Sequence, residues 1–271
     1  MDPWSLCTIT QAEELKALIK VLPIWSTAIP VAMTLNQRSF GVLQAKIMDR
    51  RFFISKFKIP PASFGVFGIL SMATTVVFYV QVLVPLLSKF TKRKRGLSLK
   101  ERMGIGIAIL CLATAVSAIV ERKRRNEAIR DGLSNYPANA VVMNMSAMWL
   151  VPQHCLTGIA EAFNYIGQIE FYYSQFPKTM SSIAMSLSAF GMGVGSLIAG
   201  LIVSIVKNVT QSEEGENWLS NNINKAHYDY YYWLLTIMGA VNIFYSIACS
   251  WAFGSCEDNE VDDMKEEDMP N

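Results

Sequence analysis

The stretch from Ser146 to Pro177, SAMWLVPQHCLTGIAEAFNYIGQIEFYYSQFP, decides how the rest of the chain is read. It is long and apolar enough to cross a bilayer, since about 20 helical residues span the hydrocarbon core. Yet a carboxylate, Glu161, stands near its middle. At helical spacing the polar side chains share one face: His154, Thr157, Glu161, Tyr165 and Gln168. Because such a stripe is costly in lipid, we expect it to face a protein interior or a watery cavity.

Glu161 is therefore the candidate residue for proton coupling or solute binding, because an ionisable group at this depth in a membrane is functional by default. The alternative is a structural carboxylate whose charge a neighbouring helix satisfies. His154 lies closer to the end of the segment, where a histidine is more often a hydrogen-bonded packing residue than a ligand.

The composition of the whole chain agrees with a membrane protein. Of its 271 residues, 52% are hydrophobic and only 17% are charged, which is too apolar for an ordinary soluble domain. The five cysteines form no CxxC pair, so neither a metal site nor a disulfide framework is expected. No HExxH, GxSxG or cofactor motif occurs, so the sequence predicts no enzyme, no catalytic residue and no cofactor.

Outward from the central segment, apolar runs separated by charged loops predict an all-α membrane protein with six transmembrane helices. Residues 1–20 form an amphipathic lead-in on the cytoplasmic side. The predicted spans cover residues 21–47, 62–87, 103–120, 146–175, 181–206 and 228–253. Residues 254–271 are acidic and are expected to form a disordered tail.

The first predicted span carries a second polar stripe, which includes Thr34, Gln37 and Gln44. We expect these three side chains to line a pathway together with Thr157, Tyr165 and Gln168 of the central segment. Two prolines, Pro23 and Pro30, predict kinks in the same span. Arg38 lies beside the stripe, and a side chain that snorkels to the surface is favoured there over one that contacts a ligand.

Two further features concern packing and the loops. In the fifth span Gly191 and Gly195 are spaced to let a neighbouring helix approach closely. The basic run KRKR at 92–95 resembles a nucleic-acid signal, but between two spans it indicates a loop at the membrane surface and no nucleic-acid partner.

The orientation follows only weakly from charge, because Lys and Arg are spread evenly over both faces. Two glycosylation sequons, at Asn144 and Asn208, fall on one face, and their use would leave both termini in the cytoplasm.

Four stretches of the chain resemble a known family. They are DPWSLCTITQAEELKALIKVLPIW, the RMGIGI opening of the third span, WLVPQHCLTGIAEAFNYIGQIEFYYSQFPKTMSS, and NINKAHYDYYYW. They are similar to the C-terminal half of plant nitrate/peptide transporter family proteins. These belong to the proton-coupled oligopeptide transporters of the major facilitator superfamily. The resemblance covers the chain except for the acidic tail.

The resemblance implies the second of two six-helix bundles, with the spans corresponding to helices seven to twelve. Glu161 then matches the family's helix-ten glutamate, implicated in proton coupling or substrate engagement, often opposite a lysine of the N-terminal bundle. The family's first-helix motif of paired glutamates and an arginine has no counterpart here. The first span lacks the histidine of some nitrate-carrying relatives. Tyr79-Val80-Gln81 replaces the usual Tyr-Asp-Arg.

The expected function is half of a proton-coupled symporter for nitrate, peptide or another small, often anionic, solute, working by alternating access. The alternative is a truncated, transport-inactive half-bundle that at most associates with full-length relatives. The expected partners are the lipid bilayer, a small solute, protons as the coupling ion, and an N-terminal half or full-length relative. Among membranes, the plasma membrane is favoured over the vacuolar membrane. A dimer in which Arg38 of a second copy faces Glu161 is a further hypothesis.

Overall fold

The protein is described here by a computed structural model covering residues 9–51, 57–91, 96–133, 141–176, 180–211, 217–220 and 222–252. The predicted tail, 254–271, lies outside these residues, as do the first eight residues of the lead-in.

The first predicted span is a broken helix. Helix α1 (Ile9–Leu35) contains both prolines and continues past them, and α2 (Arg38–Lys46) follows after a break at Asn36 and Gln37. The backbone N–H of Gln37 bonds the carbonyl of Thr34 over three residues, which tightens the end of α1. The interruption thus lies beyond the prolines that were expected to cause it.

The second span is also composite. A 3₁₀ turn, η1 (Pro61–Phe64), leads into α3 (Gly65–Phe78), then a π-helical turn, η2 (Tyr79–Leu83), and α4 (Val84–Thr91). Proline at the first position of η1 supplies a preset backbone angle for the start of the helix.

The remaining spans are single long helices. Helix α5 (Leu99–Arg130) begins at a capping box formed by Ser98 and Glu101 and extends beyond its predicted end at residue 120. A 3₁₀ turn, η4 (Ala147–Leu150), precedes α6 (Val151–Gln175). Helices α7 (Ser181–Val209) and α8 (Tyr228–Ala252) complete the bundle.

Two short strands join the loops at one end of the bundle. β1 (Met48–Asp49) pairs in parallel with β2 (Val142–Ser146), with Met48 opposite Val142. Strands of this length carry too few residues for an alternating pattern, so the sequence did not predict them.

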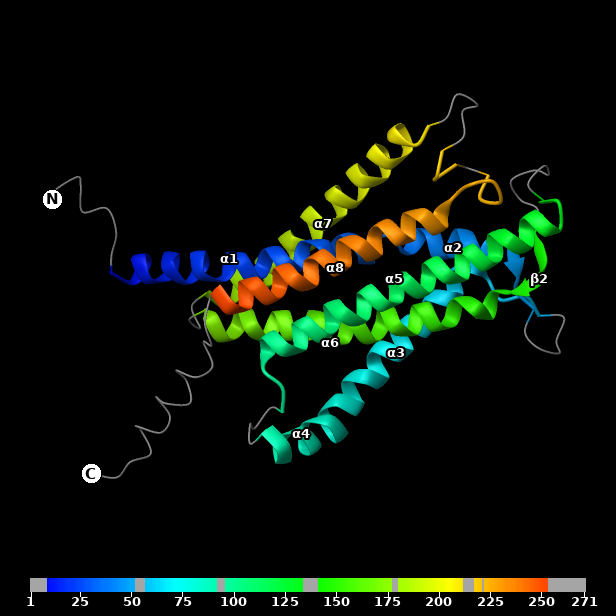
Figure 1. Ribbon diagram of the computed structural model, residues 1–271. Helices are drawn as coiled ribbons and strands as arrows, with labels where there is room; N and C mark the ends of the chain where they lie inside the picture. Colours follow the sequence, from blue (N-terminus) through cyan, green and yellow to red (C-terminus); the bar gives the residue numbers. More distant parts are fainter. Residues whose placement is uncertain are drawn as a thin grey trace.

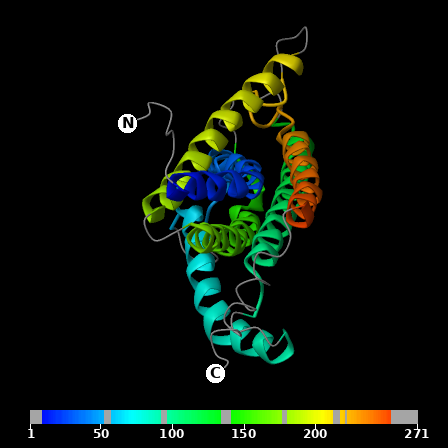
Figure 2. The ribbon, with the colours of Figure 1, turned by 90° about the vertical axis from the view of Figure 1, so that its left-hand side faces the viewer.

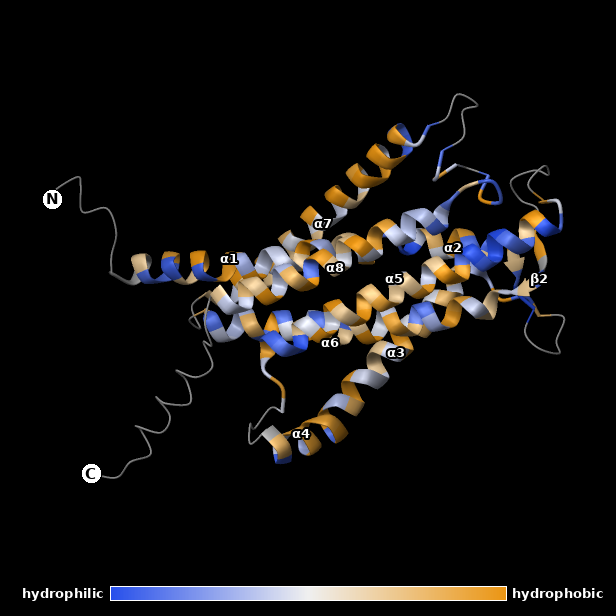
Figure 3. Ribbon diagram, in the orientation of Figure 1, coloured by the Kyte–Doolittle hydropathy of each residue, from blue (hydrophilic) through white to orange (hydrophobic). Residues whose placement is uncertain are grey.

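The helices form a bundle from which two arms diverge (Figure 1). Helix α5 packs most extensively on α6 and α8, α3 packs on α6, and α7 packs on α1. Seen along the bundle, α7 and the α3–α4 arm reach out in opposite directions (Figure 2). Both arms are largely hydrophobic along their length (Figure 3).

Small residues set the helix crossings. A Cβ added to Gly158 of α6 would lie 2.1 Å from the carbonyl oxygen of Gly68 in α3, so only glycine permits this approach. A Cβ on Gly195 of α7 would lie 2.5 Å from the Cβ of Ala32 in α1. Gly191 faces the indole of Trp25 on α1. The glycine pair predicted to let a helix approach therefore packs against α1 of the same chain.

Among the residues that the structure describes, five helical segments are long and apolar enough to cross a membrane: Ala12–Lys46, Pro61–Phe90, Leu99–Arg130, Ser181–Val209 and Tyr228–Ala252. Helix α6, the segment that was expected to be the most informative span, is not among them. Its polar residues lower its hydropathy, and the contacts with α5 and α3 shelter it. An all-α membrane protein is confirmed, with five span candidates in the described chain.

Candidate functional site

Glu161 forms an ion pair with Arg38 of the same chain. The carboxylate projects from the middle of α6, and the guanidinium comes from the first residue of α2. The side chain of Glu161 is 27% exposed and that of Arg38 is 52% exposed, so the pair stands at the border between the bundle and its surroundings. Arg38 is thus engaged across the bundle rather than snorkelling to the surface, and the pair needs no second copy.

The break in the first span positions the arginine. Helix α1 ends at Leu35 and α2 begins at Arg38. The side chain of Arg38 therefore leaves the backbone at the first residue of a new helix, in a direction that a continuous helix would not give it. Discontinuous helices recur at the solute sites of secondary transporters, where interrupted backbone borders a cavity.

A pocket of about 270 Å³ surrounds the carboxylate, and we call it the outer pocket. Helix α6 contributes Glu161, Asn164, Tyr165 and Gln168, while α1 supplies mostly apolar side chains. Two methionines, Met72 of α3 and Met192 of α7, complete the wall. The structure therefore brings Tyr165 and Gln168 together with Glu161, as the helical spacing predicts. The amide of Gln168 donates a hydrogen bond to the hydroxyl of Tyr172 at 2.8 Å.

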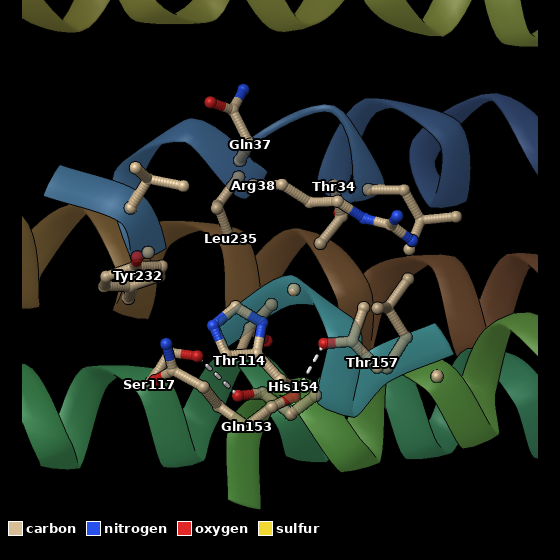
Figure 4. A pocket seen from close by; sticks show the side chains of 18 of the residues that line it. Thr34, Gln37, Arg38, Thr114, Ser117, Gln153, His154, Thr157, Tyr232 and Leu235 are labelled. Atoms are coloured by element: carbon tan, nitrogen blue, oxygen red, sulfur yellow. Dashed lines mark hydrogen bonds between the residues drawn. The ribbon is translucent and has the colours of Figure 1, made fainter. Parts of the chain in front are cut away.

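A second cavity, of about 240 Å³, lies on the other side of Arg38, and we call it the inner cavity (Figure 4). Its polar lining includes Thr34, Arg38, Gln153, His154, Thr157 and Tyr232. Gln37 also borders it, but its amide points away from His154. Arg38 lines both the inner cavity and the outer pocket and so connects them.

Gln44, predicted to line a pathway, lies deeper. It is 0% exposed, and its amide nitrogen donates to Glu121 at 2.7 Å. Its carbonyl oxygen accepts from Gln153 at 3.4 Å and from Tyr232 at 3.3 Å. Gln44 is not among the residues that line the inner cavity or the outer pocket and instead joins the inner cavity to a buried ion pair.

That buried pair, Glu121 with Arg124, was missed from the sequence. Both side chains are fully buried, and Arg124 donates to both carboxylate oxygens of Glu121, at 2.6 and 2.8 Å. It also donates to the amide oxygen of Asn224 and the carbonyl of Ile223. The spacing of three residues was the available signal. The predicted third span ended at residue 120, just before this pair.

A third ion pair joins the beginning of α5 to the end of α6. Arg102 donates to Glu170 at 2.7 Å and lies over the ring of Tyr79, 4.5 Å from its centroid. Tyr79 opens the π-helical turn at the position where the family's Tyr-Asp-Arg pattern is altered.

In the described part of the chain, no group of three or more His, Cys, Asp and Glu side chains is arranged to hold a metal ion. The arrangement holds a separable pair of charges between two pockets whose walls combine polar and apolar side chains. The carboxylate can take up a proton, and the guanidinium can then attract an anion.

Comparison with known proteins gives consistent matches. Residues 1–219 match the family model described as the POT family. The chain is 48% identical over 274 residues to Protein NRT1/PTR FAMILY 1.2 of Arabidopsis thaliana, covering 99% of this chain and 45% of that protein. It is 43% identical over 256 residues to Protein NRT1/PTR FAMILY 1.3 of the same plant, covering 94% of this chain and 50% of that protein.

Solved structures share the fold. The POT family transporter PepTSo matches with a TM-score of 0.61 at 20% identity, over 90% of this chain and 44% of that chain. An auto-inhibited POT family peptide transporter matches with a TM-score of 0.58 at 21% identity, over 86% and 42%. The chain thus spans about half the length of the relatives it matches.

Proposed function

We propose, from the premise that this chain belongs to the POT family of membrane transporters, that it forms half of a proton-coupled symporter. The family is one of transporters and not of enzymes, and the relatives named above come from a plant. The solute is nitrate, a peptide or another small, often anionic, molecule, carried by alternating access. The whole transporter's activity belongs to the proposal, because the chain corresponds to about 45% of its relatives.

One observation carries the proposal: the Arg38–Glu161 pair stands between the outer pocket and the inner cavity. An arginine stays protonated at any accessible pH, whereas a carboxylate can change its charge. A proton bound by Glu161 converts the carboxylate to a neutral acid and removes the partner of Arg38. The freed guanidinium then binds an anionic solute or lets its helix move relative to α6.

The predicted lining residues divide between the two hollows in a way that supports this role. Tyr165 and Gln168 stand beside the carboxylate in the outer pocket, and Thr34 and Thr157 stand beside the guanidinium in the inner cavity. The pair is therefore bordered on both sides by side chains of the predicted polar stripes.

A second candidate is a transport-inactive half-bundle that associates with a full-length relative. The exposed arms favour it: in the hydrophobic window of Pro61–Phe90 only 6% of the residues are buried, and in that of Ser181–Val209 only 22%, against 50% for α5. Such apolar faces require lipid or another bundle.

The localisation is part of the proposal. An integral, multi-pass membrane protein follows from the family, and we assign it to the plasma membrane in preference to the vacuolar membrane, with both termini in the cytoplasm.

Uptake separates the two candidates. The chain is expressed in oocytes alone and together with the N-terminal half of a relative, and uptake of labelled nitrate and of a labelled dipeptide is measured at external pH 5.5 and 7.5. The symporter proposal expects uptake that rises at the lower pH when both halves are present. Absence of uptake with both halves at the membrane, together with co-purification with a full-length relative, would establish the inactive half-bundle instead.

A further inference from the structure

The inner cavity has an origin in the sequence. Small residues from three helices line it: Gly41 of α2, with Ala62 of η1 and Gly65 and Gly68 of α3, and Gly158 of α6. A Cβ on Gly41 would lie 3.2 Å from the imidazole of His154, so glycine makes room for that ring. A Cβ on Gly65 would meet nothing within 4 Å, so the cavity wall is open beside it.

The lining contains polar atoms that the protein leaves unsatisfied. Oε1 of Gln153 and Nε2 of His154 are buried and have no hydrogen-bond partner among the described residues. A buried polar group without a partner costs about 1–3 kcal/mol. Such groups are normally paired or bridged by ordered water.

The size of the cavity fits water rather than a void. Its 240 Å³ far exceeds the roughly 10–15 Å³ that one water molecule needs, and the buried polar atoms in its wall offer hydrogen bonds that a wholly apolar cavity lacks. Water bound there would satisfy Gln153 and His154 and would also reach Arg38, which lines the same space.

We propose that the inner cavity is filled with water and gives protons a route to the Arg38–Glu161 pair inside this half-bundle. Ala62 and Gly65 belong to the first turns of the second span, which start at the end of the bundle that carries β1 and β2 (Figure 1). The route therefore runs from that end, which the proposed orientation places outside the cytoplasm.

The proposed proton transfer changes the charge of Glu161 and leaves the charge of Arg38 unchanged. A proton carried along the water joins the carboxylate of Glu161, giving a neutral acid, while Arg38 keeps its proton and loses its partner. Among the residues that line the inner cavity and the outer pocket, the other titratable groups are His154 and Tyr165 of α6 and Tyr232 of α8. The residues of α1, α3, α5 and α7 in these linings carry no charge.

The role of this water as a proton route rests on the proposed function. The presence of water in the inner cavity does not rest on it, and cysteine labelling tests that presence directly. In a cysteine-free background, His154→Cys and Thr157→Cys are reconstituted in liposomes and treated with a small charged methanethiosulfonate. The reference is Ile107→Cys, a core position that is 2% exposed. The hydrated thiolate attacks the sulfur of the reagent, forms a disulfide and releases methanesulfinate, so both cavity cysteines are expected to react at least about tenfold faster than the reference.

A matched pair of glycine variants tests the route. Gly65→Leu is designed to narrow the cavity opening, whereas Gly193 on α7 does not border the cavity; a Cβ added at either position meets no atom within 4 Å. The labelling rate of His154→Cys is expected to fall about tenfold with Gly65→Leu and to stay unchanged with Gly193→Leu.

The inference is overturned if both cavity cysteines react no faster than Ile107→Cys. It is also overturned if Gly65→Leu leaves the rate unchanged, or if both leucine variants lower it equally. Because labelling needs no transport, a labelled but inactive protein refutes only the symporter proposal. An active protein with unreactive cavity cysteines refutes only the water route.

Discussion

At Arg38 a permanent positive charge meets a carboxylate that can be neutralised, and the two side chains are only partly buried. Their attraction is therefore screened, and exposed ion pairs contribute about 0–1 kcal/mol to stability. The pair is better suited to a change of state than to holding the bundle together.

Replacement of the arginine separates these roles. Arg38→Gln is expected to abolish solute uptake by the assembled transporter while its melting temperature in detergent stays within about 2–4 °C of the wild type, because little stability resides in the pair. Uptake at the wild-type level would contradict the assigned role, and a collapse in melting temperature would show a structural one.

The buried pair of α5 should behave in the opposite way. Arg124→Leu leaves the fully buried carboxylate of Glu121 without its charged partner, which costs about 3–5 kcal/mol. The control is Arg130→Leu, which removes a pair at the same spacing on the same helix, where the arginine side chain is 67% exposed. Thermal unfolding should show a large loss for the first and a change of about 1 kcal/mol or less for the second. Equal losses would refute the distinction.

At this scale the sequence identified the acid, but it placed Arg38 opposite that acid only as a residue of a second copy of the chain. The position of Glu161 on a polar stripe follows from helical spacing alone. Its partner depends on the break at Asn36 and Gln37, which turns Arg38 toward α6. That geometry arises from packing between segments far apart in the chain. The burial of Glu121 and Arg124 likewise depends on the loop residues Ile223 and Asn224.

Among the helices beside the site, α3 and α6 approach each other most closely, at Gly68 and Gly158. This crossing holds the helix of Glu161 against a helix whose outer face is largely exposed.

The prolines of α1 predicted distortion of the first span, but α1 continues through both and the chain breaks later. Neighbouring helices can accommodate prolines inside a helix. The two prolines therefore indicate that the helix can be distorted, but they do not predict where it breaks.

Gly158→Ala tests the crossing. The new Cβ would lie 2.1 Å from a backbone oxygen of Gly68, which cannot rotate away, so the helices must separate. Overpacking of this kind typically costs about 1–3 kcal/mol, visible as a lower melting temperature.

The control is Gly193→Ala, where a Cβ meets no atom within 4 Å and the change is expected to be neutral or slightly stabilising. A melting temperature for Gly158→Ala as high as that of the control would show that α3 and α6 do not meet there.

For the whole molecule, an all-α membrane protein was predictable because apolar runs and charged loops alternate along the chain, although only five of the six predicted spans are candidates in the described residues. The divergence of α7 and the α3–α4 arm was not, since it depends on which helix faces find partners in this chain (Figure 2). Both arms present long apolar faces, as expected for a bundle that meets lipid or a second bundle.

The proposed orientation makes a separate prediction. Asn208 in the last turn of α7 and Lys89 in α4 are both exposed and lie toward opposite ends of the bundle. In a cysteine-free background, Asn208→Cys should react with an impermeant thiol reagent applied to intact cells, and Lys89→Cys only after permeabilisation. The reverse pattern would place the termini outside the cytoplasm.

The central claim concerns one carboxylate, and α6 offers a matched control for it. Glu170 stands on the same helix and also pairs with an arginine, but it borders neither the inner cavity nor the outer pocket. The measurement is the stimulation of solute uptake by an inward proton gradient in the assembled transporter. Glu161→Gln is expected to abolish the stimulation, and Glu170→Gln to retain it. Full stimulation in Glu161→Gln would contradict the account.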